Sequence, residues 1–220
     1  MFDFHTHTIL SDGELIPSEL VRRAFVNGYK GIGLTDHVDF ANIDHVLSGL
    51  KKAKLLEEDL DIKVIVGVEI THVPPSKIDR LVSKAKNGGA ELVVVHGETV
   101  VEPVFASTNL SAVKNVDVDI LAHPGLITPE EVKFAEENEV FLEITSRKGH
   151  NTTNGHVARV AEASKARLLV NTDAHSPDDL ITGEFALKVA LGAGLPEKDA
   201  DETINKNPYK LLEKLEMFGL

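Results

Sequence analysis

The feature that most constrains this chain is an alternation of short, apolar, β-branched runs with longer amphipathic segments. The runs predict strands at Met1–Phe4, Gly31–Leu34, Lys63–Val68, Glu91–Val95, Asp119–Ala122, Val140–Ile144 and Arg167–Val170. Helical periodicity lies between them, at Pro17–Asn27, Asp44–Asp59, Ser76–Asn87, Pro129–Glu137 and Asn154–Ser164. Such alternation is typical of parallel strands joined by crossover helices, so the chain is predicted to be an α/β protein.

Two α/β architectures fit this order, an open doubly wound sheet and a closed barrel. Seven strand–helix units favour a distorted, TIM-like (β/α)7 barrel. A length of 220 residues suits one domain over residues 1–220, with the helical stretch from about 196 to 220 packed on the barrel.

Composition narrows the range of functions. Without cysteine, the chain cannot form disulfides, thiolate zinc sites or a cysteine nucleophile. A formal net charge of −12, from 23 basic and 35 acidic residues, disfavours a stable nucleic-acid partner. The N-terminus does not resemble a signal peptide, and no apolar run reaches the roughly 20 residues that span a bilayer. We therefore expect a cytoplasmic protein without a membrane partner, whose oligomeric state remains open.

Metal-ligating side chains recur where the predicted strands end. Six of the seven strands deliver His, Asp or Glu at the C-terminal edge: His5 and His7, Asp36 and His37, Glu69, His96 and Glu98, His123, and Asp173 and His175. In a β/α barrel this edge is the face on which active sites are built. Residues distant in sequence are therefore predicted to meet there.

The spacing of these residues indicates a metal centre. In His5-Thr6-His7, residues i and i+2 of a strand point to the same side, and Asp173-Ala174-His175 repeats the pattern. Imidazoles mixed with carboxylates suit Zn, Mn or Fe better than Ca, and Mg is a weaker fit. Several clustered cations polarise a phosphoryl oxygen and lower the pKa of bound water toward ~7, which favours a metal-dependent hydrolase.

Other histidines and acids have more ordinary interpretations. His45, His72 and His156 are interpreted as surface or supporting groups. Glu143, Glu98 and Asp36 are candidates for orienting a ligand through a hydrogen bond.

The motifs together resemble the polymerase and histidinol phosphatase (PHP) superfamily. Phe-Asp-Phe-His-Thr-His-Thr-Ile-Leu-Ser-Asp-Gly at 2–13 is similar to its first motif. Thr-Asp-His at 35–37, Gly-Val-Glu at 67–69, His96, Ala-His-Pro at 122–124 and Thr-Asp-Ala-His at 172–175 follow in order. This resemblance implies a distorted seven-stranded barrel and up to three divalent cations. It also implies three ligand sets: His5, His7, Glu69 and Asp173; Glu69, His96 and His123; and Asp12, His37 and His175.

The predicted activity is hydrolysis of a small phosphomonoester, similar to histidinol phosphate or a nucleotide phosphate, by a metal-bound hydroxide. The catalytic candidates are His5, His7, Glu69, Asp173 and His175. Arg147, Lys148 and His150, which follow the sixth strand, are the candidate substrate contacts. The general acid is left unassigned.

Three alternatives remain open. One is a nuclease acting on oligonucleotide ends, and another is a non-catalytic RNA- or protein-binding scaffold built on the same barrel. A third is an amidohydrolase-type enzyme, which also begins with a strand-borne His-x-His. That class typically uses a bridging carboxylated lysine or a carboxylate at a strand end, and no lysine occupies such a position here.

Overall fold

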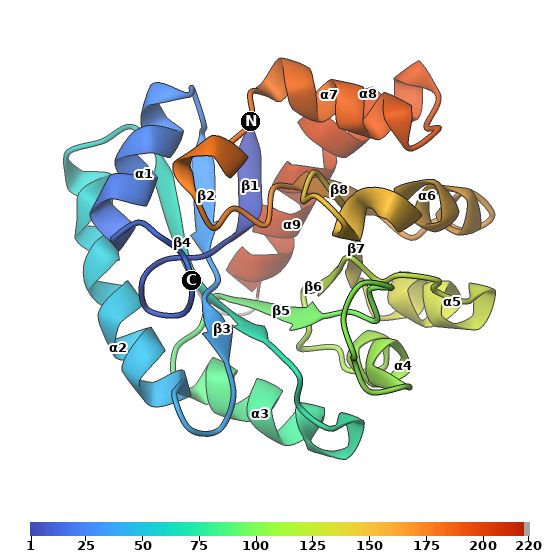
Figure 1. Cartoon of the computed structure of the whole chain (residues 1–220), viewed down its shortest axis with the longest axis horizontal. Helices are drawn as coiled ribbons and strands as arrows, with labels where there is room; N and C mark the ends of the chain where they lie inside the picture. The colour runs from blue at the N-terminus through green and yellow to red at the C-terminus, as the bar shows by residue number, and fades with distance from the viewer. Residues whose placement is uncertain (218–220) are drawn as a thin grey trace.

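The strands form one parallel sheet that curls into a nearly closed barrel, in a computed structural model that describes residues 1–217 (Figure 1). Seven strands follow the order β1-β2-β4-β5-β6-β7-β8, and the short β3 pairs with β4. The strands are β1 (Phe2–Thr6), β2 (Gly31–Leu34), β3 (His37–Val38), β4 (Lys63–Ile70), β5 (Leu92–His96), β6 (Ile120–Ala122), β7 (Phe141–Thr145) and β8 (Leu168–Asn171). The predicted TIM-like α/β barrel is confirmed.

Helices surround this barrel and connect its strands. They are α1 (Pro17–Val26), α2 (Ile43–Ala53), α3 (Pro75–Asn87), α4 (Thr108–Val113), α5 (Pro129–Glu137), α6 (Asn154–Glu162), α7 (Gly183–Gly192), α8 (Glu197–Asn205) and α9 (Asn207–Met217). Short 3-10 helices cover Lys54–Glu58, His150–Thr153 and Pro177–Asp179. A large apolar core lies between the outer face of the sheet and these helices, with Val64, Val66 and Val68 of β4 among its members.

The seam between β1 and β8 closes the barrel mainly through side chains. A single backbone bridge joins Thr6 to Ala174. Below it, the Asn171 side-chain oxygen accepts a hydrogen bond from the Phe4 N–H at 3.0 Å. Thr172 donates its hydroxyl to the Asp3 carboxylate at 2.6 Å. These bonds replace a regular ladder, so the first and last strands stay close without full pairing.

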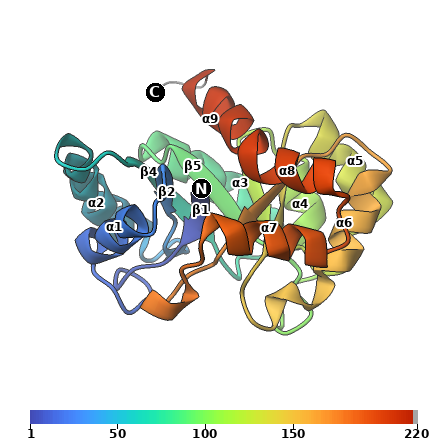
Figure 2. The same cartoon turned by 90° about the horizontal axis from the view of Figure 1, so that it is seen from above.

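The interior divides into two levels. Near the N-terminal ends of the strands, a separate apolar cluster, here called the lower interior, is formed by Phe2, Phe4, Ile65, Leu92, Val94, Ile120, Ala122, Phe141, Leu169, Leu211 and Leu215. Leu211 and Leu215 come from α9, which lies across this end of the barrel (Figure 2). The C-terminal helices were expected to pack on the barrel, and α9 lies against its end and adds Leu211 and Leu215 to the lower interior.

The observed elements refine several predicted boundaries. β4 extends to Ile70, so Glu69 lies within a strand and not after it. The predicted helix at 44–59 divides into α2 and the 3-10 helix at Lys54–Glu58. Thr128 forms the expected start of α5, because its side chain and that of Glu131 make a reciprocal capping box. The two-residue strand β3 and the short α4 were not predicted.

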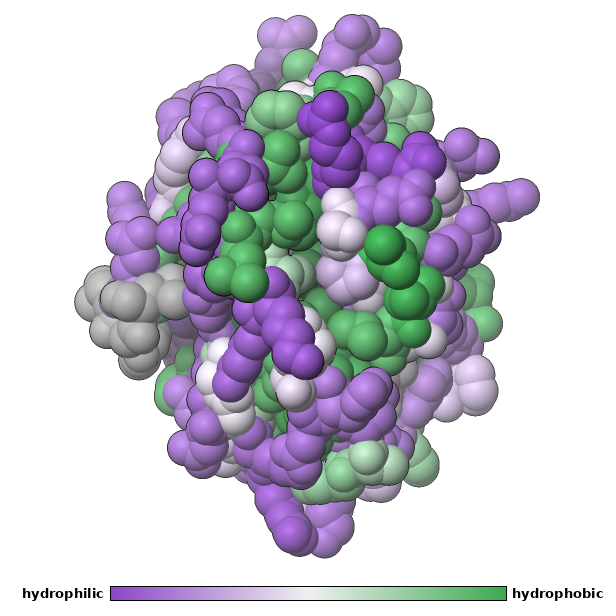
Figure 3. Space-filling model, turned by 90° about the vertical axis from the view of Figure 1, so that its left-hand side faces the viewer, coloured by the Kyte–Doolittle hydropathy of each residue, from purple (hydrophilic) through white to green (hydrophobic). Residues whose placement is uncertain are grey.

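The outer surface mixes apolar and charged groups. On the side that carries α1 and α2, hydrophobic and hydrophilic surface are intermixed (Figure 3). Val26 at the end of α1 and Leu55 just after α2 are exposed apolar side chains. Among residues 1–217, no helix is both long enough and apolar enough to cross a membrane.

Candidate metal centre

A backbone irregularity in β1 turns its histidines inward. The pairing register of β1 with β2 shifts between Asp3 and Thr6, and the His5 N–H bonds to the Asp3 carboxylate at 3.3 Å. Phe4 belongs to the lower interior, yet the next side chain, His5, also contacts interior groups. The shift therefore lets β1 contribute an apolar residue below and two imidazoles, His5 and His7, above.

Glu69 lies at the centre of these groups. Its Oε2 atom is 3.2 Å from His5 Nε2 and 3.4 Å from His7 Nε2. On the opposite side, Asp173 Oδ1 lies 3.1 Å from His7 Nε2 and 3.7 Å from His5 Nε2. These four side chains are the first ligand set expected from the sequence, and the fold brings all four together.

The second and third expected sets also converge. Glu69, His96 and His123 each present a ligand atom within 4.8 Å of the others. Asp12 Oδ1 lies 3.3 Å from His175 Nε2 and 3.6 Å from His37 Nε2, and His7 joins this group. We call the full set the upper cluster: His5, His7, Asp12, His37, Glu69, His96, His123, Asp173 and His175.

The buried polar atoms of the upper cluster fit a set of cations. Among the described residues, no well-aligned hydrogen bond is made by His5 Nε2, His7 Nδ1 and Nε2, both Glu69 oxygens, His96 Nδ1, His123 Nδ1 or Asp173 Oδ1. His37 Nδ1 lies 2.7 Å from Glu69 Oε2, but it bonds to the Thr71 hydroxyl at 2.6 Å. A buried polar atom without a partner costs about 1–3 kcal/mol, and carboxylates cost more. Divalent cations bound between these imidazole and carboxylate atoms would give each atom a partner and so offset this cost.

The charges within the upper cluster push its pKa values apart. Burial lowers the pKa of His37, but the Glu69, Asp12 and Asp173 carboxylates together outweigh burial and raise that pKa to about 9. Burial raises the pKa of Asp173 to about 7, and burial together with His37 lowers the pKa of His7 well below its usual range. Protons and cations therefore compete for the same atoms.

Backbone strain collects at the same place. Non-glycine residues with positive φ include His72 at 53°, His123 at 26° and Asp173 at 53°. Such conformations cost on the order of 1–3 kcal/mol each and persist where the surrounding structure enforces them. Gly125 follows His123, and a Cβ there would lie 1.8 Å from the Glu98 carbonyl oxygen, so this turn requires glycine.

Neighbouring side chains orient the ligands. Glu143 Oε2 lies 2.8 Å from His5 Nδ1, and Glu143 Oε1 accepts the His123 N–H at 3.2 Å. Asp36 accepts the Ser11 hydroxyl at 2.7 Å and so fixes the loop that carries Asp12. Both residues lie where an orienting role was predicted. Glu98 instead accepts the Asn109 N–H at 2.9 Å.

A cavity of about 440 Å³ opens above the cluster. Arg147 and His150 line it, whereas Lys148 is exposed and is not among the lining residues. Arg147 donates to Asp179 at 3.0 Å, which holds its guanidinium at the rim. His72, interpreted from sequence as a surface or supporting group, also lines this cavity.

Sequence reasoning missed one carboxylate here. Glu102 lies on the loop between β5 and α4 and lines the cavity. The stretch that carries it has no strand or helix periodicity that would have predicted its position. His45 is exposed, and His156 bonds to the Ile127 carbonyl at 2.7 Å, so neither joins the upper cluster.

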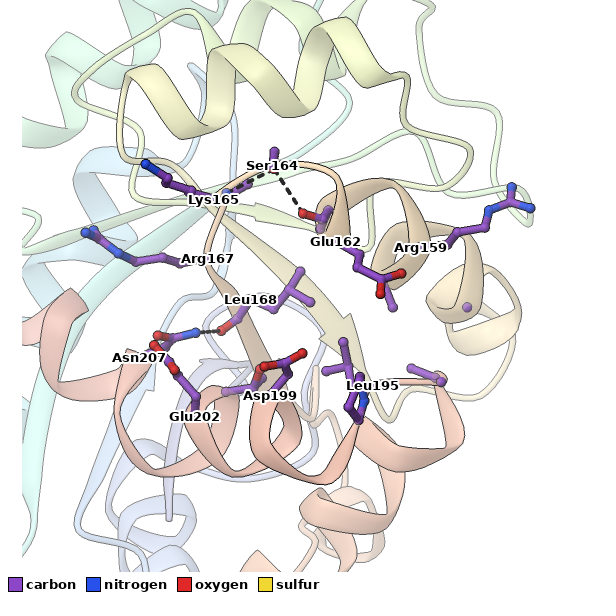
Figure 4. A pocket seen from close by; sticks show the side chains of 18 of the residues that line it. Arg159, Glu162, Ser164, Lys165, Arg167, Leu168, Leu195, Asp199, Glu202 and Asn207 are labelled. Atoms are coloured by element: carbon purple, nitrogen blue, oxygen red, sulfur yellow. Dashed lines mark hydrogen bonds between the residues drawn. The ribbon is translucent and has the colours of Figure 1, made fainter.

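A larger cavity of about 690 Å³ lies elsewhere, between α6 and the α7–α8 region. Some of the polar groups that line it are paired with one another (Figure 4). Asn207 donates to the Leu168 carbonyl at 2.9 Å, and Lys210 pairs with Glu202 at 2.8 Å. None of the unpartnered buried atoms found among the described residues belongs to this cavity. The smaller cavity is therefore the candidate site.

Comparison with known sequences agrees with this geometry. The family model of the PHP domain matches residues 3–160 of this chain. An uncharacterised protein of Methanocaldococcus jannaschii is 53% identical over 219 residues, which is 97% of this chain and 99% of that relative. A probable phosphatase of a Thermoanaerobacter species is 29% identical, over 98% of this chain and 94% of its own length.

Other similar proteins belong to ribonuclease P. Ribonuclease P protein component 3 of Methanosarcina barkeri is 26% identical, over 97% of this chain and 89% of its own length. A chain in a structure of archaeal ribonuclease P with mature tRNA superimposes with a TM-score of 0.75 at 17% identity, covering 100% of this chain and 93% of that one. At that identity the superposition shows the fold alone.

Proposed function

This chain belongs to the PHP domain family, and we propose that it is a phosphoesterase that uses divalent cations to hydrolyse a small phosphomonoester at the upper cluster. The observation that supports this most strongly is the convergence of nine imidazole and carboxylate side chains, several with buried unpartnered atoms, beneath one cavity. That donor set suits Zn, Mn or Fe. Relatives named as probable phosphatases add support.

The side chains divide the work by position. Glu69 presents one oxygen toward His5 and His7 and the other toward His123, so one carboxylate serves two ligand sets. Cations held by these residues would supply positive charge to a phosphoryl transition state and would lower the pKa of water. Asp173 completes the ligand set of His5, His7 and Glu69. Asp12, His37 and His175 form the third ligand set.

Arg147 is placed to bind the substrate phosphate. Asp179 holds one guanidinium nitrogen at 3.0 Å, and the Nε atom lies 4.0 Å from Asp173, so the group faces the cluster. The planar guanidinium has further N–H donors for phosphate oxygens. A cavity of about 440 Å³ suits a small ester better than a folded nucleic acid.

A second candidate function is action on, or binding to, RNA. The full-length similarity to ribonuclease P protein component 3 supports it. A net charge of −12 opposes it, because phosphate neutralisation relies on clustered Lys and Arg. We therefore place it second.

The test is phosphate release by the purified protein, loaded with Mn²⁺ or Zn²⁺, from histidinol phosphate, nucleoside bisphosphates and an aryl phosphate. A 5′-labelled oligonucleotide is included, and each reaction is repeated with chelator. We expect chelator-sensitive release from at least one monoester. Cleavage of the oligonucleotide alone would support a nuclease. If no substrate reacts although the cations are bound, the phosphoesterase proposal fails.

A further inference from the structure

Glu102 contacts three imidazoles at the rim of the cavity. Its Oε2 atom lies 3.1 Å from His96 Nε2 and 3.2 Å from His72 Nε2, and its Oε1 atom lies 3.4 Å from His150 Nε2. His96 is buried, whereas the Glu102 side chain is 36% exposed. Glu102 thus joins a residue of the upper cluster to two residues at the rim.

The two nitrogens of His96 face different surroundings. Nε2 lies 3.1 Å from Glu102 Oε2, and a carboxylate oxygen only accepts hydrogen bonds, which favours the tautomer with the proton on Nε2. Nδ1 is buried and has no hydrogen-bond partner among residues 1–217. Its lone pair is therefore free in a ring that lies with Glu69 and His123 in one candidate ligand group.

His5 shows the same arrangement with the nitrogens exchanged. Its Nδ1 atom bonds to Glu143 at 2.8 Å, and its buried Nε2 atom has no hydrogen-bond partner in the described chain. A histidine that ligates a metal commonly donates its other N–H to a carboxylate, which fixes the tautomer and the ring orientation. Glu143 does this for His5 deep in the barrel, and Glu102 is the corresponding carboxylate at the rim.

We propose that Glu102 is a positioning residue, which orients His96 so that Nδ1 binds the cation held with Glu69 and His123. The proposal rests on the metal cluster of the proposed function. It also gives His150 a role apart from substrate contact, since His150 lies 3.4 Å from the second Glu102 oxygen and holds the carboxylate in place.

The loop that carries Glu102 is itself held to His150. His150 Nδ1 lies 2.8 Å from the Thr99 hydroxyl, three residues before Glu102. The Glu102 carboxylate is therefore fixed from both of its oxygens and through its own loop. A pre-organised carboxylate loses little entropy when it orients a ligand.

The experiment compares Glu102→Gln with His72→Gln. Glu102→Gln changes the partner of three imidazoles, including His96, whereas His72→Gln changes only the contact that His72 makes. Each protein is stripped, titrated with Co²⁺ and followed by its visible absorption spectrum, and the bound metal is counted by elemental analysis. We expect Glu102→Gln to lower the affinity for one Co²⁺ ion about 10- to 100-fold and to change the visible spectrum of that ion. We expect His72→Gln to have the same Co²⁺ affinity and spectrum as the unaltered protein.

Two results would overturn the proposal. Unchanged Co²⁺ affinity and spectrum in Glu102→Gln would show that Glu102 does not act on His96. Loss of one whole cation in both variants would instead show a separate cation bound by His72, His96 and Glu102. If the unaltered protein bound no Co²⁺, the metal cluster itself would fail, which distinguishes that failure from the failure of Glu102 alone.

Discussion

The lower interior and the upper cluster are built on the same strands but differ in the kind of side chain that fills them. β7 contributes Phe141 below and Glu143 above, and β5 contributes Leu92 below and His96 above. Below, apolar side chains fill the barrel and α9 covers the end. Above, imidazoles and carboxylates replace them. One barrel thus has an end that holds the structure together and an end that is available for chemistry.

Buried charge distinguishes the two ends most clearly. At the lower end, the Lys214 ammonium donates to the Val118 and Glu139 carbonyls at 3.0 and 3.1 Å and lies 3.3 Å from Asp119. At the upper end, Glu69 and His7 are equally buried, yet their atoms include several without a hydrogen-bond partner among the described residues. The difference teaches that partner satisfaction, more than burial, separates a structural polar group from one prepared for a ligand.

Replacing Glu69 should have the largest effect at the upper end. Glu69→Gln removes a charge shared by two ligand sets, so we expect phosphate release to fall more than about 100-fold, beyond the usual cost of losing an orienting group. Glu143 contacts the cluster through His5 and the His123 N–H, so we expect Glu143→Gln to lower phosphate release about 10- to 100-fold. Steady-state kinetics on both variants check the order, and equal losses would contradict the central place of Glu69.

Shortening Leu211 should have the largest effect at the lower end. Leu211→Ala leaves a cavity beneath the barrel, so we expect unfolding to cost about 2–5 kcal/mol less than in the unaltered protein. The neighbouring Leu212 is only partly buried, and Leu212→Ala serves as the matched control. Urea unfolding measures both. Loss of bound cations at unchanged stability would show that the two ends are not separable.

Lys214 should give a smaller effect that depends on pH. Lys214→Met leaves two carbonyl oxygens without a hydrogen-bond donor, so we expect the free energy of unfolding to fall by about 2 kcal/mol. Burial lowers the pKa of Lys214 below its usual 10.5, so the unfolded chain binds this proton more tightly than the folded protein. Its contribution to stability therefore rises as the pH climbs from the lowered pKa toward 10.5. Urea unfolding at neutral and alkaline pH should show this rise in the unaltered protein and not in Lys214→Met.

Arg147 should give the smallest effect, confined to substrate binding. Arg147→Lys keeps the charge but loses the planar fork, so we expect KM to rise about tenfold with the cation content unchanged. Lys148 is the adjacent cation outside the cavity lining, and Lys148→Gln should leave KM unaltered. An equal rise in both variants would mean that general positive charge, and not the placement of Arg147, attracts the substrate.

The upper cluster was more predictable from sequence than the lower end. Each of its strand-borne residues follows an apolar run, and parallel strands must end at one edge, so His5, Glu69 and Asp173 were expected to meet. α9 was expected to pack on the barrel, but the end that it covers was not predicted. Its amphipathic pattern shows that one face is buried but does not say against which surface.

Glu102 shows where sequence reasoning ends. It lies in an irregular loop, so neither a period of 2 nor one of 3.6 fixes the direction of its side chain. Its role depends on His72, His96 and His150, which come from three different loops or strand ends. Only the folded chain places them together. The register shift in β1, which lets both Phe4 and His5 point into the barrel, likewise could not be predicted from the sequence.

The most direct test of the difference between the two ends is the number of divalent cations bound per chain. The unaltered protein and Glu69→Gln would be loaded with Mn²⁺ or Zn²⁺, desalted and measured by elemental analysis. We predict two or three bound cations in the unaltered protein and a loss of at least one in Glu69→Gln. An unaltered protein that retains none would contradict the assignment of the upper cluster as a metal centre.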